Sequence, residues 1–407
     1  MPIPLFEEKV QVYEAKIKVY VELLHKVVRL YDEQEIVRKF LGFPQVVDRI
    51  IRNSIAKDHG LFFARLDGYI DAHTGKIKFL ENNSDAPAGT LFTPRINNMS
   101  IRFMNELEIF KPHTQISEFT FQEENSMLNA LQKVFEDKFS RTPRTLVIFQ
   151  IRNQSNRESI ELSQLSTQTF KVYVTDPRDV RHKSNSLYTI DGEKIDLIWN
   201  KINTVYWNRL VEESPELLSL WDEMMESDSD FIHFNPFCYR YITENKLFAS
   251  LLYAAEFEQF FTSEELAIRD TFIPVSYKIG HSQEVQYNNE THDLHILAQG
   301  NRKDFVLKEP YDIRGDGVTI GVDCDAETWK IKLEEVLQKG GILQEYIKPQ
   351  QLPFFHDFQE TNLINMNFHI DTFLFGNKLL GFGAKASTNH KVNIFQGGIK
   401  VPIIVFK

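Results

Sequence analysis

The spacing of apolar residues near the N-terminus predicts a long helix. Between residues 5 and 40, apolar or aromatic side chains recur every three or four residues, at Val10, Tyr13, Ile17, Val21, Leu24, Val28 and Tyr31. This is the spacing of one face of an α-helix. We therefore expect residues 1–44 to form an N-terminal helical layer.

The pattern then changes to that of a β-hairpin. Asp58-His59-Gly60 interrupts the helical spacing, and two runs that alternate apolar and polar residues follow, LFFARLDGYI and KIKFLEN. Ala72–Gly75 lies between them and has the composition of a turn. Helical spacing returns over residues 101–138. These features predict a hairpin between helices within residues 45–138.

The middle of the chain alternates strands with a helix. Three short apolar runs, TLVIFQI, FKVYVTD and KIDLIWNKI, have the character of buried strands, and SNRESIELSQLSTQ lies between the first two. This order predicts a βαβ unit with a parallel sheet over residues 139–235. ESPELLSLWDEMM predicts a further helix.

The last part of the chain mixes both patterns. Residues 235–260 are mostly helical in spacing, whereas residues 271–300 have the composition of a loop. DFVLKEP and ILQEYIKP predict strands on either side of a glycine turn and the helix AETWKIKLEEVLQ, which Gly340 and Gly341 should end. Residues 351–407 predict further strands.

Composition and charge narrow the class of protein. The chain has 407 residues, 42% of them hydrophobic, so it can bury a large core and is not a disordered chain. Its net charge of −11 makes nucleic acid an unexpected partner. The two cysteines are far apart in the sequence, which predicts reduced thiols. We find no signal peptide and no apolar run long enough to cross a membrane, so we expect a cytoplasmic location and no membrane partner.

Four polar residues of the predicted hairpin suggest a cation site. Strand alternation places Arg65 and Asp67 on one face of the first strand, and Glu81 and Asn83 on one face of the second. Oxygen donors from Asp67, Glu81 and Asn83 suit Mg²⁺, and Arg65 beside them suits a phosphate. Taken alone, the same residues also fit an ordinary charged surface hairpin.

Two lysines and a glycine turn suggest phosphate binding. Lys246 lies in a helical segment, and Lys308 follows the apolar run FVL directly. A strand lysine can hold a nucleotide phosphate as a point charge. Gly315 and Gly317 can bring backbone N–H groups close to phosphates. Each lysine alone also fits a surface residue, and the turn alone fits a hairpin.

The strand that follows the last predicted helix offers a possible edge for a purine. Gln344, Glu345 and Tyr346 come after its apolar start. A plain strand end fits them equally well. Other well-known signatures are missing: the sequence has no P-loop, no GxGxxG at the βαβ unit, no HExxH and no GxSxG.

Together, the order of these segments resembles the circularly permuted ATP-grasp ligases, the family that includes the synthetase domain of glutathionylspermidine synthase. The resemblance covers residues 45–407, and its most specific part is RLD followed by ENNSDAP. In an unpermuted ATP-grasp protein the acidic metal segment follows the lid, whereas here it precedes the lid. The matching segments are ARLDGYID, IKFLENNSDAPAG, TDPRDVR, KIDLIWNK, NPFCYRYITENKLFASLL, DFVLKEPYDIRGDGVTIG, AETWKIKLEEVLQKGGILQEYI, GFGAKAS and VNIFQGG.

The resemblance implies a mixed α+β or α/β fold of the permuted ATP-grasp type, with a βαβ substrate-side domain and a small ATP lid. The implied segments are a helical layer over 1–44, a metal-binding segment over 45–138, the βαβ domain over 139–235, an ATP-binding helix and lid over 236–350, and core-completing strands over 351–407. The implied roles are catalysis for Arg65 and Lys385, Mg²⁺ binding for Asp67, Glu81 and Asn83, and ATP binding for Lys246, Lys308, Gly315, Gly317, Gln344, Glu345 and Tyr346. Lys385 stands where the family strand usually carries an arginine.

The function implied is an ATP-dependent carboxylate–amine ligase that uses ATP and two Mg²⁺ ions, forms an amide through an acyl phosphate, and releases ADP and phosphate. Its partners would be small carboxylates and amines such as amino acids, peptides or polyamines. Two alternatives stay open at this point. One is a catalytically inactive protein of this fold that binds nucleotide or a partner, and the other is an ATP-dependent phosphotransferase.

Overall fold

The computed structural model describes residues 2–407 except 57–59, 61–62, 112, 155, 184–185, 219–220, 222–228, 313–314 and 356–361, and the side chain of residue 395. Parts of the sequence-based predictions fall outside these ranges. They are the break in the helical pattern at residues 58–59, the first two residues of the predicted hairpin, much of the helix predicted over residues 213–225, and two residues of the glycine turn.

A long central sheet organises the molecule, and all its strand pairs are antiparallel. Its order is β19-β18-β17-β2-β3, and β16 pairs with β17 as a branch. The hairpin predicted from the sequence forms its edge. The strands are β2 (Phe63–Ile70), β3 (Ile77–Asn83), β16 (Gln351–Phe354), β17 (Ile364–Phe375), β18 (Lys378–Ser387) and β19 (Ile399–Val401).

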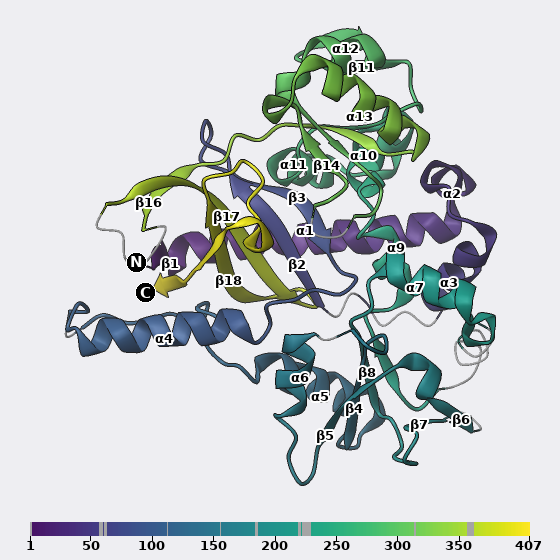
Figure 1. The fold of residues 1–407 in the computed structure, drawn as a ribbon, viewed down its shortest axis with the longest axis vertical. Helices are drawn as coiled ribbons and strands as arrows, with labels where there is room; N and C mark the ends of the chain where they lie inside the picture. The colour runs from purple at the N-terminus through teal and green to yellow at the C-terminus, as the bar shows by residue number, and fades with distance from the viewer. Residues whose placement is uncertain are drawn as a thin grey trace.

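The N-terminal helix α1 (Glu7–Glu33) covers one face of this sheet (Figure 1). Its apolar stripe is buried, as its spacing predicts, and two of its tyrosines reach the sheet. Tyr20 donates a hydrogen bond to Asn82 Oδ1 at 2.7 Å, and the Tyr13 hydroxyl lies 3.0 Å from Thr372 Oγ1. Side chains that alternate with Asn82 and Thr372 must therefore lie on the opposite face, away from α1.

The first residues are not all helical. Strand β1 (Ile3–Phe6) pairs in parallel with β20 (Ile403–Phe406), which precedes the C-terminal residue. A partner about 400 residues distant leaves no local signal in the sequence. The remaining helices of the layer are α2 (Glu35–Leu41) and α3 (Gln45–Ala56).

A four-stranded sheet of order β5-β4-β8-β9 lies below the central sheet in Figure 1. Its strands are all parallel, as the alternation of strands and helix predicts. The elements from β4 to β9 are β4 (Thr145–Phe149), α6 (Arg157–Ser163), β5 (Lys171–Thr175), η1 (Pro177–Asp179), β6 (Arg181–Lys183), β7 (Ser186–Tyr188), β8 (Leu197–Asn200), α7 (Thr204–Glu213) and β9 (Ile232–Phe234). The short strands β6 and β7 pair with each other as a separate antiparallel hairpin.

Another antiparallel sheet, of order β10-β15-β13-β14, lies above the central sheet. Helix α13 packs on it through Trp329 and Leu333, with α12 beside α13. The elements from α9 to β15 are α9 (Phe237–Ile242), α10 (Leu247–Tyr253), η2 (Ala255–Phe260), α11 (Ser263–Phe272), β10 (Ser276–Lys278), β11 (Glu284–Tyr287), β12 (Glu290–Asp293), α12 (Leu294–Gly300), η3 (Arg302–Asp304), β13 (Phe305–Lys308), β14 (Val318–Ile320), η4 (Gly321–Asp323), α13 (Ala326–Gln338) and β15 (Ile342–Glu345).

The prediction of a loop over residues 271–300 is wrong. Most of this segment is structured, because it contains β10, the hairpin β11–β12 and helix α12. Asn288 and Asn289 both have positive φ, 51° and 65°, which is the backbone of a tight two-residue hairpin turn. Val285 and Tyr287 alternate along β11 and pack against the apolar cluster of the upper sheet.

The helix predicted over residues 101–138 is in fact two helices, α4 (Phe92–Glu106) and α5 (Ser126–Phe139). The segment between them pairs with the C-terminal strand instead, because Ser117 N–H donates to Val405 O at 2.8 Å. A short 3₁₀ helix, η5 (Ile394–Gln396), precedes the C-terminal strands.

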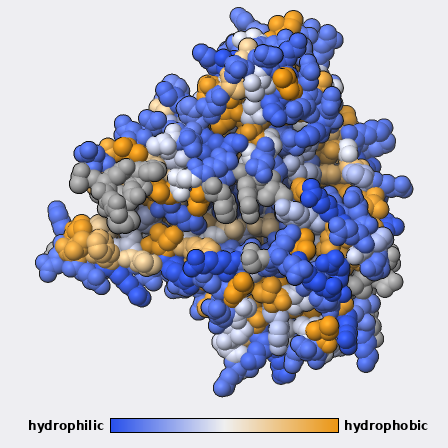
Figure 2. All heavy atoms as spheres, viewed as in Figure 1, coloured by the Kyte–Doolittle hydropathy of each residue, from blue (hydrophilic) through white to orange (hydrophobic). Residues whose placement is uncertain are grey.

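Helix α4 projects from the molecule and has two apolar faces. Its inner face packs near β18 and β20, where Asn97 and Ile101 are buried. Its outer face exposes Met99 and Phe103, and Leu107 and Ile109 follow just beyond the helix. Orange spheres at the left of Figure 2 lie over this helix, whereas most of the visible face is polar. Among the described helices, none combines the length and the apolar composition of a membrane-spanning segment.

Candidate active site

The polar residues of the hairpin lie together on the sheet face opposite α1. Arg65 is the register partner of Asn83, and Asp67 is the partner of Glu81. A bulge after Asp67 shifts the register by one residue, so that Glu81 and not Leu80 lies opposite Asp67. The close packing there requires glycine at position 68, where a Cβ atom would come within 2.5 Å of Lys78 O. Sequence alternation predicts that Arg65 shares a face with Asp67 and that Glu81 shares a face with Asn83, whereas the bulge brings the two pairs opposite one another.

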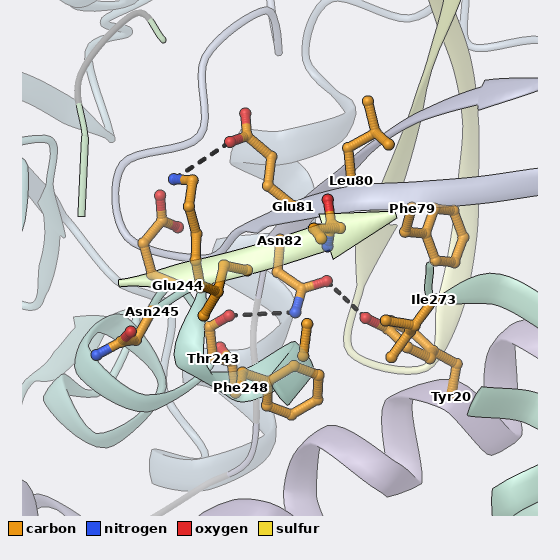
Figure 3. A pocket seen from close by; sticks show the side chains of 14 residues that line it. Tyr20, Phe79, Leu80, Glu81, Asn82, Thr243, Glu244, Asn245, Phe248 and Ile273 are labelled. Atoms are coloured by element: carbon orange, nitrogen blue, oxygen red, sulfur yellow. Dashed lines mark hydrogen bonds and ion pairs between the residues drawn. The ribbon is translucent and has the colours of Figure 1, made fainter. Parts of the chain in front are cut away.

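Figure 3 shows the same alternation from close by. Asn82 points toward α1, between Tyr20 and Thr243, and donates to the Thr243 carbonyl oxygen at 3.1 Å. Glu81 points the other way, toward an ammonium group. One strand thus uses consecutive residues for packing and for the site.

Strands β17 and β18 extend the polar face with residues that the sequence analysis did not select. Asp371 is the register partner of Asp67 on one side, and His369 is the partner of Lys385 on the other. A signal was present in NFHIDTF, where polar Asn367, His369 and Asp371 alternate within an apolar strand. We call Arg65, Asp67, His369, Asp371 and Lys385 the charged cluster.

Within the charged cluster, Asp67 holds Arg65 through two hydrogen bonds. Arg65 Nε lies 2.6 Å from Asp67 Oδ1, and Nη2 lies 2.9 Å from Oδ2. Burial opposes the charge of Asp67, but Arg65 and Lys385 lower the pKa of this carboxyl below its usual value. Both oxygens of Asp67 are therefore occupied by cations, so this residue orients Arg65.

Lys385 bridges the two carboxylates of the cluster, at 3.1 Å from Asp67 and 2.9 Å from Asp371. Against the effect of burial, Asp371 and Asp67 raise the pKa of Lys385. His369 Nδ1 lies 3.0 Å from Asp371 Oδ1. Asp67, His369 and Asp371 are close enough together to ligate an ion, but Lys385 already supplies the positive charge there.

Two lysines from separate segments converge on strand β3. Lys246 Nζ lies 3.4 Å from Glu81 Oε2 and also pairs with Asp312. Lys308 Nζ donates to the Leu80 carbonyl oxygen at 2.8 Å. The sequence analysis selected both lysines but missed Asp312, although it follows Lys308 by only four residues at the start of the glycine turn.

Three oxygen-bearing side chains near these lysines have the chemistry of a magnesium site. They are Glu81, Asn83 and Asp312, and the side chain of Asp312 is 5% exposed. Among the described residues, Asp312 Oδ2 and Asn83 Nδ2 find no hydrogen-bond partner, although both atoms are buried. A buried carboxylate oxygen without a donor is costly unless a cation completes it, so this set fits Mg²⁺ better than one including Asp67.

Two spaces of very different size lie around Glu81, Lys246 and Asp312. Glu81, Lys246 and Gln344 line a pocket of about 20 Å³, which has room for little more than a water molecule. On the far side of Asp312 is a cavity of about 380 Å³, lined by Tyr206 and Arg209 of α7 and by the glycine turn. Glu309 and Asp316 also line this cavity, and Glu309 pairs with Lys339 Nζ at 2.7 Å, so Asp316 is the carboxylate that favours a positively charged ligand there.

The glycine turn is tight and is bound to the C-terminal part of the chain. Gly315 has a φ of +77°, and a Cβ atom on Gly317 would come within 2.9 Å of Asp312 Cβ. Lys391 Nζ donates to Gly315 O at 2.7 Å and to Val318 O at 3.0 Å. Both glycines are therefore required by the conformation of the turn.

The predicted purine edge lies on β15 and beyond it. Gln344 is buried, and its Nε2 donates to Ser276 Oγ at 3.0 Å. The N–H groups of Glu345 and Tyr346 donate to the carbonyl oxygens of Val275 and Asp304 at 2.8 Å and 2.7 Å. The backbone N–H groups of Glu345 and Tyr346 are therefore engaged within the protein.

Removal of either converging lysine should weaken ATP binding. Loss of a charge-assisted contact costs about 1.5–3 kcal/mol, so Lys246→Ala and Lys308→Ala should each raise the Kd for Mg²⁺-ATP by roughly ten- to a hundredfold. Isothermal titration calorimetry measures this. Lys330→Ala, at an exposed position on α13, is the matched control. Unchanged affinity in both variants would assign these lysines to packing alone.

The charge of Lys308 should make ATP binding depend on pH. Burial, together with the charge of Lys246, lowers the pKa of Lys308 to about 8 in the free protein, despite Glu81 and Asp312. Phosphate favours the ammonium form, so ATP binding should take up protons between pH 8 and 9, and affinity should fall as pH rises. Calorimetry in buffers of different ionisation enthalpy measures the uptake.

Two variants separate proton uptake by Lys308 from proton uptake by a neighbouring carboxyl group. Lys308→Arg keeps its charge at all these pH values and should abolish the uptake. Burial, reinforced by Asp85, raises the pKa of Glu244 to about 8, so the Glu244→Gln variant shows how much of any uptake belongs to that group. Proton uptake that survives Lys308→Arg and vanishes in Glu244→Gln would contradict the prediction.

Comparison with known proteins finds similarity in structure but not in sequence. No family model matches the chain, and no curated protein matches it. Among solved structures, a glutathione synthetase-like effector from Globodera pallida in its apo form aligns with 99% of this chain and 89% of its own. The TM-score is 0.60 and the sequence identity is 14%.

A second structure, a putative γ-glutamylcysteine synthetase from Methylobacillus flagellatus, aligns with 94% of this chain and 87% of its own. Its TM-score of 0.46 at 13% identity is too low to support an inference. At 14% identity the first likeness concerns the backbone. The chain is therefore a mixed α/β protein that shares the fold of the glutathione synthetase-like effector.

Proposed function

We propose that this protein is an ATP-dependent carboxylate–amine ligase of the ATP-grasp type, with ATP bound between the upper sheet and the central sheet. The observation that carries the proposal is the convergence of Lys246 and Lys308 on strand β3, where Lys246 pairs with Glu81 and Asp312 and Lys308 donates to Leu80 O, beside the charged cluster. The shared fold with a protein described as glutathione synthetase-like supports it.

In this proposal Lys246 and Lys308 hold the phosphates of ATP. In the present structure Lys246 is paired with Asp312 and Glu81, so it exchanges part of this pairing for phosphate when ATP binds. The carbonyl edge of Gln344 to Tyr346 contacts the adenine, and the Gly315–Gly317 turn lies over the phosphates. Because the pocket of about 20 Å³ is too small for a nucleotide, the two sheets must separate to admit it.

Glu81, Asn83 and Asp312 are the proposed ligands of Mg²⁺, which supplies charge neutralisation at the β- and γ-phosphates. Sequence reasoning proposes Asp67 in place of Asp312. The contacts favour a different task for Asp67, since it fixes the guanidinium of Arg65 in the plane of its carboxylate. Arg65 Nη1 also donates to Ala88 O at 2.8 Å, which completes its fixation.

The reaction proceeds in two transfers. An oxygen of the substrate carboxylate attacks the γ-phosphorus, the bond to the β-phosphate oxygen breaks, and ADP leaves. The amine then attacks the carbonyl carbon of the acyl phosphate, the carbon–oxygen bond breaks, phosphate leaves and the amine loses a proton. Arg65 and Lys385 stabilise the negative charge on the transferred group, and no protein nucleophile is needed.

The cavity beside Asp312 is suited to the amine substrate. Asp316 favours a protonated amine before it reacts, and Arg209, which also lines the cavity, suits an anionic group on the same molecule. This composition fits amino acids and peptides as acceptors, and polyamines less well because of the arginine.

A screen for ADP release with Mg²⁺-ATP and pairs of amino acids, short peptides and polyamines tests the proposal. One ADP and one phosphate released for each amide formed supports the ligase. ADP without phosphate, and with a phosphorylated acceptor, would instead show a phosphotransferase. ATP binding without turnover of any pair would favour a nucleotide-binding protein without catalysis.

Arg65→Lys should slow phosphoryl transfer without weakening ATP binding. Lysine keeps the charge but loses the planar group that Asp67 fixes, and the interaction matters most as charge develops on the γ-oxygens. We expect kcat to fall at least about tenfold, or ~1.4 kcal/mol, with ATP Kd nearly unchanged. Single-turnover ADP formation at saturating ATP measures this. Arg95→Lys, on α4, is the matched control because it also pairs with carboxylates. Normal kcat with weakened binding would make Arg65 a ground-state anchor.

A further inference from the structure

The outer face of helix α4 carries a row of exposed apolar side chains. Met99, Phe103 and Leu107 are 64%, 59% and 54% exposed, and we call them the apolar row. They are four residues apart, and Leu107 continues the last helical turn because its N–H donates to Phe103 O at 3.1 Å. Single exposed apolar side chains are common on protein surfaces, whereas a contiguous row of large ones is typical of an interaction surface.

The helix is also placed for contact with another molecule. It projects at the left of the molecule in Figure 1, and the orange spheres at the left of Figure 2 lie over it. Its inner face is held by the rest of the chain, because Asn97 Nδ2 donates to Phe121 O at 2.9 Å and to Phe382 O at 3.2 Å. The outer face is therefore a preformed surface on a helix that is fixed from behind.

The apolar row is symmetric about its middle residue. Met99 and Leu107 lie about 6 Å before and about 6 Å after Phe103 along the helix axis. When a second copy of α4 packs against the first in the antiparallel direction, with a two-fold axis at Phe103, each Met99 faces Leu107 of the other copy. Residues four apart also form the ridges that interlock when two helices pack. The apolar row is thus complementary to itself, as a two-fold interface requires.

Two charged residues lie beside the apolar row and are not paired within the chain. Arg102 and Glu106 are exposed and lie on the same flank of the row, about 100° and about 60° around the helix from Phe103. Neither forms an ion pair in the part of the chain that the structure describes, although the two are four residues apart. Arginine before glutamate is the weaker order for such a pair within one helix. Both charges are therefore available to a partner.

The antiparallel arrangement brings these charges together across the interface. Arg102 lies about 1.5 Å before Phe103 along the helix axis, and Glu106 lies about 4.5 Å after it. In the reversed copy Glu106 lies on the other side of the axis, so it comes within about 3 Å of the level of Arg102. The two-fold axis keeps both residues on the same flank, so the pair forms twice. Charges that flank an apolar contact between helices select the partner and its direction.

A membrane surface fits this face less well. Helices that bind anionic lipids carry an excess of basic residues on their polar face. The charges beside the apolar row, Arg102 and Glu106, cancel each other, and the whole chain has a net charge of −11. An anionic lipid surface would therefore gain nothing from electrostatic attraction.

We propose that the outer face of α4 is the interface of a two-fold symmetric homodimer, with the apolar row at its centre and Arg102 of each copy paired with Glu106 of the other. The partner is a second copy of this chain. The inference is independent of the proposed ligase function, because the apolar row takes no part in the candidate active site. One pair of helices buries less than an interface of standard size, so the dimer should dissociate on dilution.

Sedimentation velocity of the full chain tests the dimer. The wild type should change from monomer to dimer as its concentration rises to about 100 μM. Phe103→Asp places a carboxylate at the centre of the apolar row and should keep the protein monomeric over this range. Ile331→Asp is the matched control, since Ile331 is 52% exposed on α13, and should leave the association unchanged. Thermal unfolding of each variant checks that the fold is intact.

A mixing experiment tests the pairing of charges. Arg102→Glu and Glu106→Arg each place like charges opposite one another, so each variant alone should associate at least about tenfold more weakly than the wild type. Equal amounts of the two variants should associate with each other, because opposite charges then meet at both positions.

Three results would overturn the inference. The first is a wild type that stays monomeric at about 100 μM, and the second is a dimer that survives Phe103→Asp. The third is association that neither charge reversal changes. Binding of a monomeric wild type to phosphatidylserine vesicles, lost in the Phe103→Asp variant, would assign the apolar row to a membrane surface instead.

Discussion

Glu81→Gln and Asp312→Asn should each weaken Mg²⁺-dependent ATP binding by at least about a hundredfold. Even residues that only support metal ligands change metal affinity by roughly ten- to a hundredfold, so loss of a direct carboxylate ligand should cost more. Both substitutions keep the size of the side chain and remove its charge. Loss of the Asp312 carboxylate should matter for a second reason, because one of its oxygens is buried with no donor in the part of the chain that the structure describes.

Calorimetric titration with ATP, with and without Mg²⁺, measures this loss. Glu334→Gln is the matched control, since Glu334 is an exposed carboxylate on α13. The Asp67→Asn variant decides between the two sets of ligands. If Asp67→Asn removes the Mg²⁺ dependence and Asp312→Asn does not, the ligands are those that sequence alone proposes.

Arg240→Met should destabilise the protein by about 3–5 kcal/mol, because it leaves Asp85 as an unpaired buried charge. Arg240 is fully buried and its Nη2 lies 2.5 Å from Asp85 Oδ1. Its Nη1 also donates to Asp85 O at 2.5 Å and to Asn200 O at 2.7 Å. Asp85 itself accepts from the backbone and side chain of Thr204.

This ion pair joins the loop that follows the hairpin to α9, and hydrogen bonds of the two residues extend the connection to Asn200 at the end of β8 and Thr204 at the start of α7. Its removal should therefore loosen the attachment of the parallel sheet to the candidate active site. Chemical denaturation measures the free energy of unfolding. Arg209→Met, at an exposed position on α7, should change it by less than about 0.5 kcal/mol.

A double variant separates charge from packing. Asp85→Asn combined with Arg240→Met removes both charges and should be less destabilising than Arg240→Met alone. A double variant as unstable as the sum of the two single variants would mean that the pair acts through independent contacts and not through the buried charge.

The sequence alone predicts much of the local structure of this protein. The apolar stripe of α1 and the alternation in β2 and β3 are local patterns, so both are readable before any tertiary contact is known. The same alternation predicts that Arg65 shares a face with Asp67 and that Glu81 shares a face with Asn83, and the bulge after Asp67 then brings the two pairs together. The order of strands and helix also predicts the parallel sheet correctly.

Other local features gave misleading signals. The polar composition of residues 281–300 predicts a loop, yet a two-residue asparagine turn and a few apolar side chains are enough for a hairpin and a helix. The helical spacing over residues 101–138 misses the segment that turns away to pair with the C-terminal strand. In both cases contacts with distant residues outweigh composition.

What only the tertiary structure decides is which charges meet. Asp67 and Asp371 are about 300 residues apart in sequence, and only the pairing of β2 with β17 makes them neighbours. That pairing, with Lys385 between them, turns Asp67 from a free oxygen donor into the support of Arg65. Asp312 becomes a candidate ligand for the same kind of reason, because the glycine turn folds back onto Lys246. Residue types and local spacing thus determine which chemistry is available, whereas burial and long-range pairing determine which atoms are free to perform it.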